Sequence, residues 1–318
     1  MGIGISAFKF LLRENQRQPF SGKVLQLGRQ DIVFTMEDAQ QAARCFNFKL
    51  PEIPAKLSAK PAFAAQHFLS DETVFKLLGF AECRAADVSS FESADYLFDL
   101  NDPDVPAQLR ESFDVVVDSG TLEHVFHVPN ALANIFKLLR PGGRIIHISP
   151  SSNHVDHGFY MFSPTLFYDF YTANEFEINV VKFFRYTIMA HIDPWDIVDY
   201  TPGRLQSVSF GGLDNNLYGI ICVATKTAAS TAHRVPQQGA WIELWNRKEP
   251  QSQQVQQAQP AKRPPWYRPV KKAYDHVCRW LRYPVEKSYD HVCRWLLHRL
   301  SSRIPQQRKL ELTFDERL

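Results

Sequence analysis

Residues 113–150 constrain the fold more than any other part of the chain. Two apolar runs, residues 113–117 and 144–149, flank a segment with helical periodicity at residues 130–139. A helix between two buried strands is the usual crossover of a parallel pair, because parallel strands cannot be joined by a short hairpin. This stretch therefore predicts a βαβ unit of a parallel sheet.

The same alternation continues on both sides of this unit. Further candidate strands are residues 24–27, 83–86, 96–98, 178–184 and 217–225. Candidate helices are residues 35–47, 70–79 and 164–175. Alternating strands and helices predict an α/β fold, with a mostly parallel sheet that has helices on both faces. Such sheets bind ligands at the carboxyl ends of their strands.

A change in composition divides the chain. Residues 1–230 hold the predicted α/β domain. Residues 231–269 lose the apolar periodicity and are rich in Gln and Pro, which predicts a linker because such a segment buries little apolar surface. Residues 270–318 are predicted to form a basic, amphipathic helical tail. From residue 262 to the end there are 14 Lys and Arg against 6 Asp and Glu.

The tail contains an internal repeat. The sequence Tyr-Asp-His-Val-Cys-Arg-Trp-Leu occurs at residues 274–281 and again at 289–296. Its Tyr, Val, Cys and Leu recur at the spacing of one helical face, so we predict amphipathic helices. The neighbouring Arg and Trp residues suit an anionic membrane surface. Docking of these helices on the protein itself or on a protein partner is an equal alternative.

Several classes of protein are disfavoured. No apolar run approaches the length that crosses a bilayer. Five cysteines, an odd number without a Cys-x-x-Cys pair, argue against a disulfide framework and for a reducing compartment. We therefore expect a cytoplasmic protein, with a peripheral position at the membrane if the tail binds there. The acidic balance of residues 1–261 argues against a nucleic-acid partner.

The stretch 113–150 resembles the fourth strand, crossover helix and fifth strand of Rossmann-like, class I S-adenosylmethionine-dependent methyltransferases. The apolar strand before Asp118 and the Leu-Arg-Pro-Gly-Gly turn at residues 139–143 carry this resemblance. It extends more weakly over residues 23–227. The resemblance implies a seven-stranded Rossmann-like sheet, S-adenosylmethionine as cofactor, and methyl transfer as the activity.

The resemblance also implies the cofactor-binding residues. Asp87 follows the second strand, where an acid holds the ribose hydroxyls, and Asp99 follows the third strand, where an acid contacts the adenine. A carboxylate suits the first position because it can accept hydrogen bonds from two hydroxyl groups at once. The full predicted set is Gln26, Gly28, Asp87, Asp99, Leu100, Asp118, Ser119 and Gly120.

The first strand departs from the family pattern. The family has a Gly-rich turn with an acid two residues before its first glycine. Here Gln26 occupies the acid's position, and Gly28 alone remains of the glycines. Arg29 is a candidate to meet the carboxylate of the ligand. The long Pro-containing segment between Gly28 and Asp87 is expected to form a lid or a substrate wall.

Candidate catalytic residues follow the fourth and fifth strands. His157 is the first candidate for a base that accepts the proton of a hydroxyl acceptor, His124 is the second, and Tyr160 is an orienting group. His154, Asp156 and His157 could ligate a metal, but no further ligand motif accompanies them, so we predict no metal site.

The leading hypothesis is methyl transfer from S-adenosylmethionine to a small molecule or a glycan. The alternative is a non-catalytic Rossmann-fold adaptor tethered by its basic tail. A nicotinamide-dependent oxidoreductase ranks third, because the Gly-x-Gly-x-x-Gly turn of that class is absent from the sequence.

Overall fold

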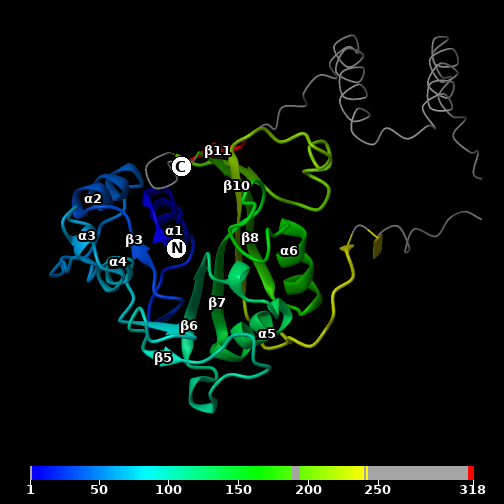
Figure 1. Cartoon of the computed structure of the whole chain (residues 1–318), viewed down its shortest axis with the longest axis horizontal. Coiled ribbons are helices and arrows are strands. Elements are labelled where there is room, and N and C mark those ends of the chain that lie inside the picture. Colours follow the sequence, from blue (N-terminus) through cyan, green and yellow to red (C-terminus); the bar gives the residue numbers. More distant parts are fainter. Residues whose placement is uncertain (1, 188–193, 240, 243–313) are drawn as a thin grey trace, which may run out of the picture. The chain divides into compact units, whose positions relative to one another are not determined.

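A computed structural model describes residues 2–187, 194–239, 241–242 and 314–318 (Figure 1). The chain divides into two compact units. The first comprises residues 1–242 together with 311–318, and the second comprises residues 243–310. The second unit, and with it the sequence repeat and most of the predicted linker and tail, lies outside the described residues. Among the described residues, no helix is both long enough and apolar enough to cross a membrane.

The first unit is built on one mixed sheet. Its strand order is β11-β9-β8-β10-β7-β6-β2-β4-β5. The strands are β2 (Lys23–Leu27), β4 (Glu82–Asp87), β5 (Tyr96–Leu97), β6 (Phe113–Ser119), β7 (Leu139–Pro150), β8 (Glu177–Tyr186), β9 (Asp196–Asp199), β10 (Leu217–Thr225) and β11 (Glu316–Arg317). Pairing is parallel from β5 through β7, whereas β10 is antiparallel to both of its neighbours. The predicted parallel core is therefore confirmed.

The sheet in the described residues is larger than the seven strands predicted. Strands β9 and β11 extend it at one edge, and β1 (Gly2–Ile3) pairs with β3 (Asp31–Ile32) in a separate small sheet. Strand β9 lies between β8 and β10 in the chain, where no strand was predicted. Trp195, just before it, is buried and stacks on Phe184 with a ring separation of 4.0 Å.

The end of the chain belongs to the first unit. Strand β11 pairs with β9, and Leu318 exchanges two backbone hydrogen bonds with Trp195. The Leu318 side chain is buried in the core beside α1 (Ile5–Arg17). The prediction of a helical tail through residue 318 is wrong at this end, because residues 316–317 satisfy their backbone groups in the sheet.

The helices follow local signals in the sequence. They are α1, α2 (Met36–Cys45), α3 (Pro61–Ala64), α4 (Asp71–Leu77), α5 (Val128–Leu138) and α6 (Pro164–Ala173). Thr35 and Asp38 form a capping box at α2, and the Ser70 hydroxyl accepts a hydrogen bond from the Thr73 amide at α4. Side-chain caps of this kind satisfy amides that the first helical turn leaves without partners.

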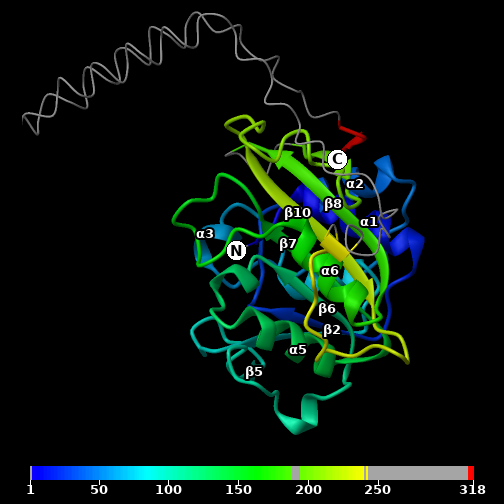
Figure 2. The ribbon, with the colours of Figure 1, turned by 90° about the vertical axis from the view of Figure 1, so that its right-hand side faces the viewer.

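Alternation along the strands produces two cores, one on each face of the sheet. Val115 and Val117 pack with α1, α2 and α4, whereas Phe113 and Val116 pack with α5 and α6. Figures 1 and 2 show these two groups of helices on opposite sides of the sheet. Because both faces are covered, the edge at the carboxyl ends of the parallel strands is the place where polar side chains can gather.

Candidate active site

Three neighbouring strands end side by side at this edge. Leu27 of β2 pairs with Ala86 of β4 on one side and with Asp118 of β6 on the other. Gly28 leaves the sheet there, with its amide bonded to the Ala86 carbonyl at 2.8 Å. Gly28 and Gly120 have φ angles of 67° and 86°. Side chains are disfavoured in that conformation, so both turns need glycine and leave bare backbone at the edge.

Two predicted ligand residues stand at the ends of the next strands. Asp87 closes β4 and Asp99 follows β5, and both side chains are partly exposed. One oxygen of Asp87 accepts a hydrogen bond from the Ser89 amide, and one oxygen of Asp99 accepts from the Asn101 amide. These bonds fix each carboxylate at the edge. Leu100 differs, because its side chain is buried in the core on the α5 side of the sheet.

The side chain of Gln26 is hydrogen-bonded to other residues of the protein. Its buried amide nitrogen donates to Asp71 at 2.7 Å and to the Cys83 sulfur at 3.1 Å, and its oxygen accepts from the Gln30 amide at 3.0 Å. Gln26 therefore stabilises the turn after β2 through its side chain. The thiol of Cys83 stays neutral here, since burial raises its pKa to about 12.

The guanidinium group of Arg29 is also hydrogen-bonded to other residues of the protein. Its guanidinium donates to the carboxylates of Asp71 and Asp95 and to the carbonyls of Glu92 and Ser93. Arg29 was expected to meet a ligand carboxylate, but in the structure it has a structural role. It links the turn after β2 to α4 and to the segment before β5.

Asp118 anchors the turn after β6 from inside the core. One oxygen accepts hydrogen bonds from the amides of Thr121 and Leu122, and the other lies 2.6 Å from His147 Nδ1. His147 Nε2 in turn lies 2.7 Å from the hydroxyl of Tyr171. Burial raises the pKa of Tyr171 well above its usual value, so the hydroxyl is neutral and can donate to the imidazole. The structure thus places Asp118 in a buried network that supports the turn after β6, and Ser119 beside it is also buried.

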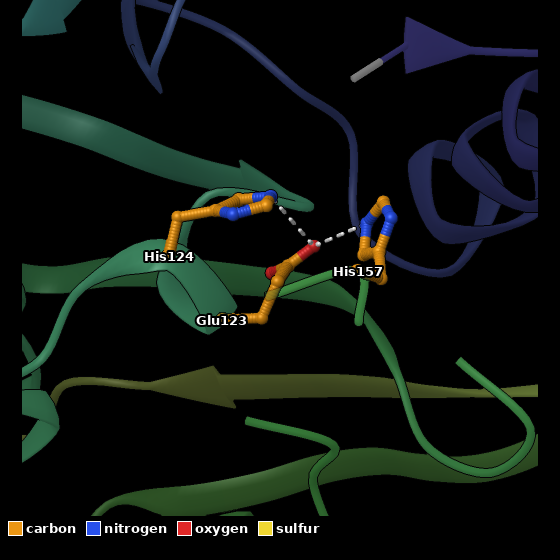
Figure 3. Close-up of side chains that lie close together, drawn as sticks. All are labelled: Glu123, His124 and His157. Atoms are coloured by element: carbon orange, nitrogen blue, oxygen red, sulfur yellow. Dashed lines mark ion pairs between the residues drawn. The ribbon is translucent and has the colours of Figure 1, made fainter. Parts of the chain in front are cut away.

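A second cluster lies at the same edge and faces outward. Glu123 and His124 belong to the short 3-10 turn η2 (Leu122–His124), and His157 belongs to the segment after β7. A Glu123 carboxylate oxygen lies 3.6 Å from His157 Nε2 and 3.9 Å from His124 Nε2 (Figure 3). The Glu123 side chain is 1% exposed, whereas the two imidazoles are 47% and 42% exposed.

Burial controls the ionisation of this cluster. It raises the pKa of Glu123 to about 8, and the nearby charge of Asp118 adds to the effect. Burial also lowers the pKa of His124, with a further contribution from the second imidazole, His157. The protein therefore raises the pKa of a carboxyl group and lowers that of a neighbouring imidazole, and perturbed pKa values of this kind are common in active sites.

Backbone hydrogen bonds bring the two segments of the cluster together. The carbonyl oxygen of Glu123 accepts from the amides of Phe159 and Tyr160. Gly158 makes this approach possible, since a Cβ there would lie 2.9 Å from that oxygen. The hydroxyl of Tyr160 donates to the Phe126 carbonyl at 2.8 Å. Tyr160 therefore contributes by holding the segment in place.

The structure thus brings together only some of the predicted catalytic residues. His124 and His157 lie together, with ring centres 5.2 Å apart, and His154 lies beside His157 while bonding the Tyr186 hydroxyl at 2.9 Å. Sequence reasoning missed Glu123. The signal was present, because a Glu-His pair follows the strand end that was expected to border the site.

Comparisons with known proteins agree with the resemblance. Residues 80–145, which span β4, β5, β6 and α5, match a family model described as a methyltransferase domain. No curated protein matches the chain.

Solved structures of methyltransferases are similar at low identity. One is 1,6-didemethyltoxoflavin-N1-methyltransferase from Burkholderia thailandensis, solved with bound 1,6-didemethyltoxoflavin and S-adenosylhomocysteine. It is 15% identical over 70% of this chain and 78% of that chain, with a TM-score of 0.35. Another is an S-adenosylmethionine-dependent methyltransferase from Archaeoglobus fulgidus, 11% identical over 69% of this chain and 94% of that chain, with a TM-score of 0.35. The chain therefore contains a segment, residues 80–145, that matches a methyltransferase-domain family.

Proposed function

We propose that this chain transfers a methyl group from S-adenosylmethionine to a hydroxyl group of a small molecule or a glycan. The observation that carries the proposal is the cluster of Glu123, His124 and His157 at the edge where parallel sheets bind ligands. Attack by an oxygen requires that the hydroxyl lose its proton, and this cluster is suited to assist that loss.

The cofactor fits the neighbouring strand ends. Gly28 and Gly120 leave space for close approach to the backbone, and Asp87 lies beside Gly28 at the end of β4. Asp87 would accept hydrogen bonds from the ribose hydroxyls, and Asp99 would accept one from the adenine amino group. Gln26 and Asp118 would act indirectly, because their side chains accept hydrogen bonds from the amides of the two turns.

Two tasks in the reaction then fall to the residues of the chain. When bound, S-adenosylmethionine supplies a methyl group on a positively charged sulfur. The protein must hold the acceptor oxygen in line with that carbon and receive its proton, since alignment supplies much of the acceleration in displacements of this kind. His157 is the proposed proton acceptor, because its imidazole is half exposed and lies 3.6 Å from the buried Glu123 carboxyl group.

One observation favours the alternative of a non-catalytic binding protein. The family's acid at the first strand is replaced by Gln26, whose side chain is occupied by Asp71, Cys83 and Gln30. A chain that had lost cofactor binding could keep the same fold.

A transfer assay separates these functions. The full-length chain is incubated with S-adenosylmethionine and with panels of phenols, polyols and oligosaccharides, and S-adenosylhomocysteine release is measured. His157→Ala should lower turnover by about 10²–10⁴-fold if the residue accepts the proton. His67→Asn, at an exposed histidine after α3, is the control. If no acceptor class leads to release of S-adenosylhomocysteine, the result would favour the alternative of a non-catalytic binding protein.

We further propose, from the sequence alone, that the basic repeat brings the protein to anionic membrane surfaces. This proposal concerns residues outside the described part of the chain. It rests on the Arg and Trp content of the repeat.

A further inference from the structure

We propose that Glu123, His124 and His157 form a binding site for one divalent transition-metal ion such as Zn²⁺, and that this ion holds the acceptor oxygen. The proposal of a metal site is based on the geometry of the three side chains. Its part in catalysis rests on the proposed function.

The donor atoms are already close to the spacing that a metal requires. One nitrogen of each imidazole and one carboxylate oxygen all lie within 4.8 Å of one another. Two ligands that are each about 2.1 Å from a tetrahedral zinc ion lie roughly 3.4 Å apart. The observed separations from the Glu123 oxygen are 3.6 Å to His157 and 3.9 Å to His124, so small rotations of the side chains would complete the site.

The burial of Glu123 supplies an independent argument. Neither carboxylate oxygen has a hydrogen-bond partner among the described residues, although both are buried. A buried carboxylate without such partners is costly, because its hydration is lost and nothing replaces it. A cation between Glu123 and the imidazoles would offset that cost directly, and Figure 3 shows the carboxylate directed at the space between the two rings.

The donor set selects the class of metal. Two imidazole nitrogens and one carboxylate oxygen suit zinc or iron(II), whereas magnesium and calcium prefer oxygen ligands throughout. A neighbouring residue supports the arrangement: the ring of His154 packs against His157 while its Nε2 bonds Tyr186.

Three protein ligands leave coordination positions open. The two imidazoles are about half exposed, so the open side faces solvent, where an acceptor can enter. A hydroxyl bound to such an ion loses its proton more readily, as metal-bound water does. With the ion bound, His124 and His157 act as ligands and the proton passes to water; without the ion, His157 is the proposed proton acceptor.

The methyl transfer does not change the oxidation state of the metal. The acceptor O–H bond breaks and its proton leaves to water. The oxygen then forms a bond to the methyl carbon while the carbon–sulfur bond breaks, and the electron pair of that bond returns to sulfur. The products are the methyl ether and neutral S-adenosylhomocysteine.

Cobalt(II) is the probe for this site, because its absorption reports both binding and ligand type. The full-length chain is stripped with a chelator and titrated with Co²⁺. The titration uses a Cys278→Ser, Cys293→Ser background, which removes the two thiols of the repeat. We expect one equivalent to bind without a thiolate charge-transfer band, and Zn²⁺ to displace it. Glu123→Gln and His157→Ala should each weaken binding by at least about tenfold, whereas His67→Asn should not.

Circular dichroism establishes that each variant is folded, and the isosteric Glu123→Gln change guards against a general loss of structure. The proposal is overturned if the background protein binds no Co²⁺, or if Glu123→Gln binds as tightly as the background. This titration contains neither S-adenosylmethionine nor an acceptor. Its failure would therefore leave the proposed methyl transfer standing, and failure of cofactor binding would leave the metal site standing.

Discussion

The amide of Phe159 donates a 2.8 Å hydrogen bond to the carbonyl oxygen of Glu123. This bond joins the segment after β7 to the turn after β6, and it places His157 beside the carboxylate of Glu123. Gly158 lies at the point of contact, where a Cβ would approach the Glu123 carbonyl oxygen to 2.9 Å and its Cγ to 3.2 Å. The geometry of the cluster therefore depends on a residue that takes no part in chemistry.

Gly158→Ala should separate the two segments and lower turnover by about tenfold or more, because small displacements of aligned groups are costly. Thermal unfolding should change little, since the segment is largely exposed. Val155→Ala is the control, because it lies in the same segment and its residue is 82% exposed. Equal turnover of Gly158→Ala and the wild type would show that the cluster does not require this contact.

The buried chain of Asp118, His147 and Tyr171 should act as one unit in stability. Asp118→Asn removes a charged acceptor and should cost about 1–3 kcal/mol, and Tyr171→Phe should cost about 1 kcal/mol. In urea unfolding, the double variant should depart from the sum by at least about 0.5 kcal/mol, because both changes alter the partners of His147. Strict additivity would mean that the two hydrogen bonds are independent.

Ionisation of Glu123 should make stability depend on pH. Its pKa is about 8 in the folded chain and near 4.5 when unfolded. Between these values the folded state holds a proton that the unfolded state has released, so stability falls as pH rises. In chelator-treated protein, the free energy of unfolding relative to Glu123→Gln should fall by up to about 1.4 kcal/mol per pH unit between about pH 5 and 8. Parallel curves for the two proteins would contradict the buried position of Glu123.

The sequence predicted the parallel core because its strands are short apolar runs between clear helix signals, such as Ser70 at α4. It could not predict β11, which depends on residues more than a hundred positions away from β9 in the chain. The same limit applied to the site. Single residues such as Asp87 could be placed at strand ends, but the meeting of Glu123 with His157 arises from a contact between two loops.

The position of Leu318 changes how the basic repeat should be tested. A chain cut after Ala229 would also lose β11 and a buried core residue. A full-length variant with Arg279, Arg282, Arg294 and Arg299 replaced by Ala avoids this loss. It should sediment less with vesicles containing anionic lipid at low salt, since each Arg near such a surface contributes about 1 kcal/mol. Equal sedimentation of variant and wild type would favour protein docking.

Binding of S-adenosylmethionine by the full-length chain is the most direct test of the assignment. Titration calorimetry should give saturable heat, and Asp87→Ala should weaken binding by about 1–3 kcal/mol because a charged hydrogen bond to the ribose is lost. Asp104→Ala is the control, since that exposed carboxylate pairs with Arg110 and should leave binding unchanged. Absence of heat at millimolar S-adenosylmethionine, in a folded sample, would contradict the account.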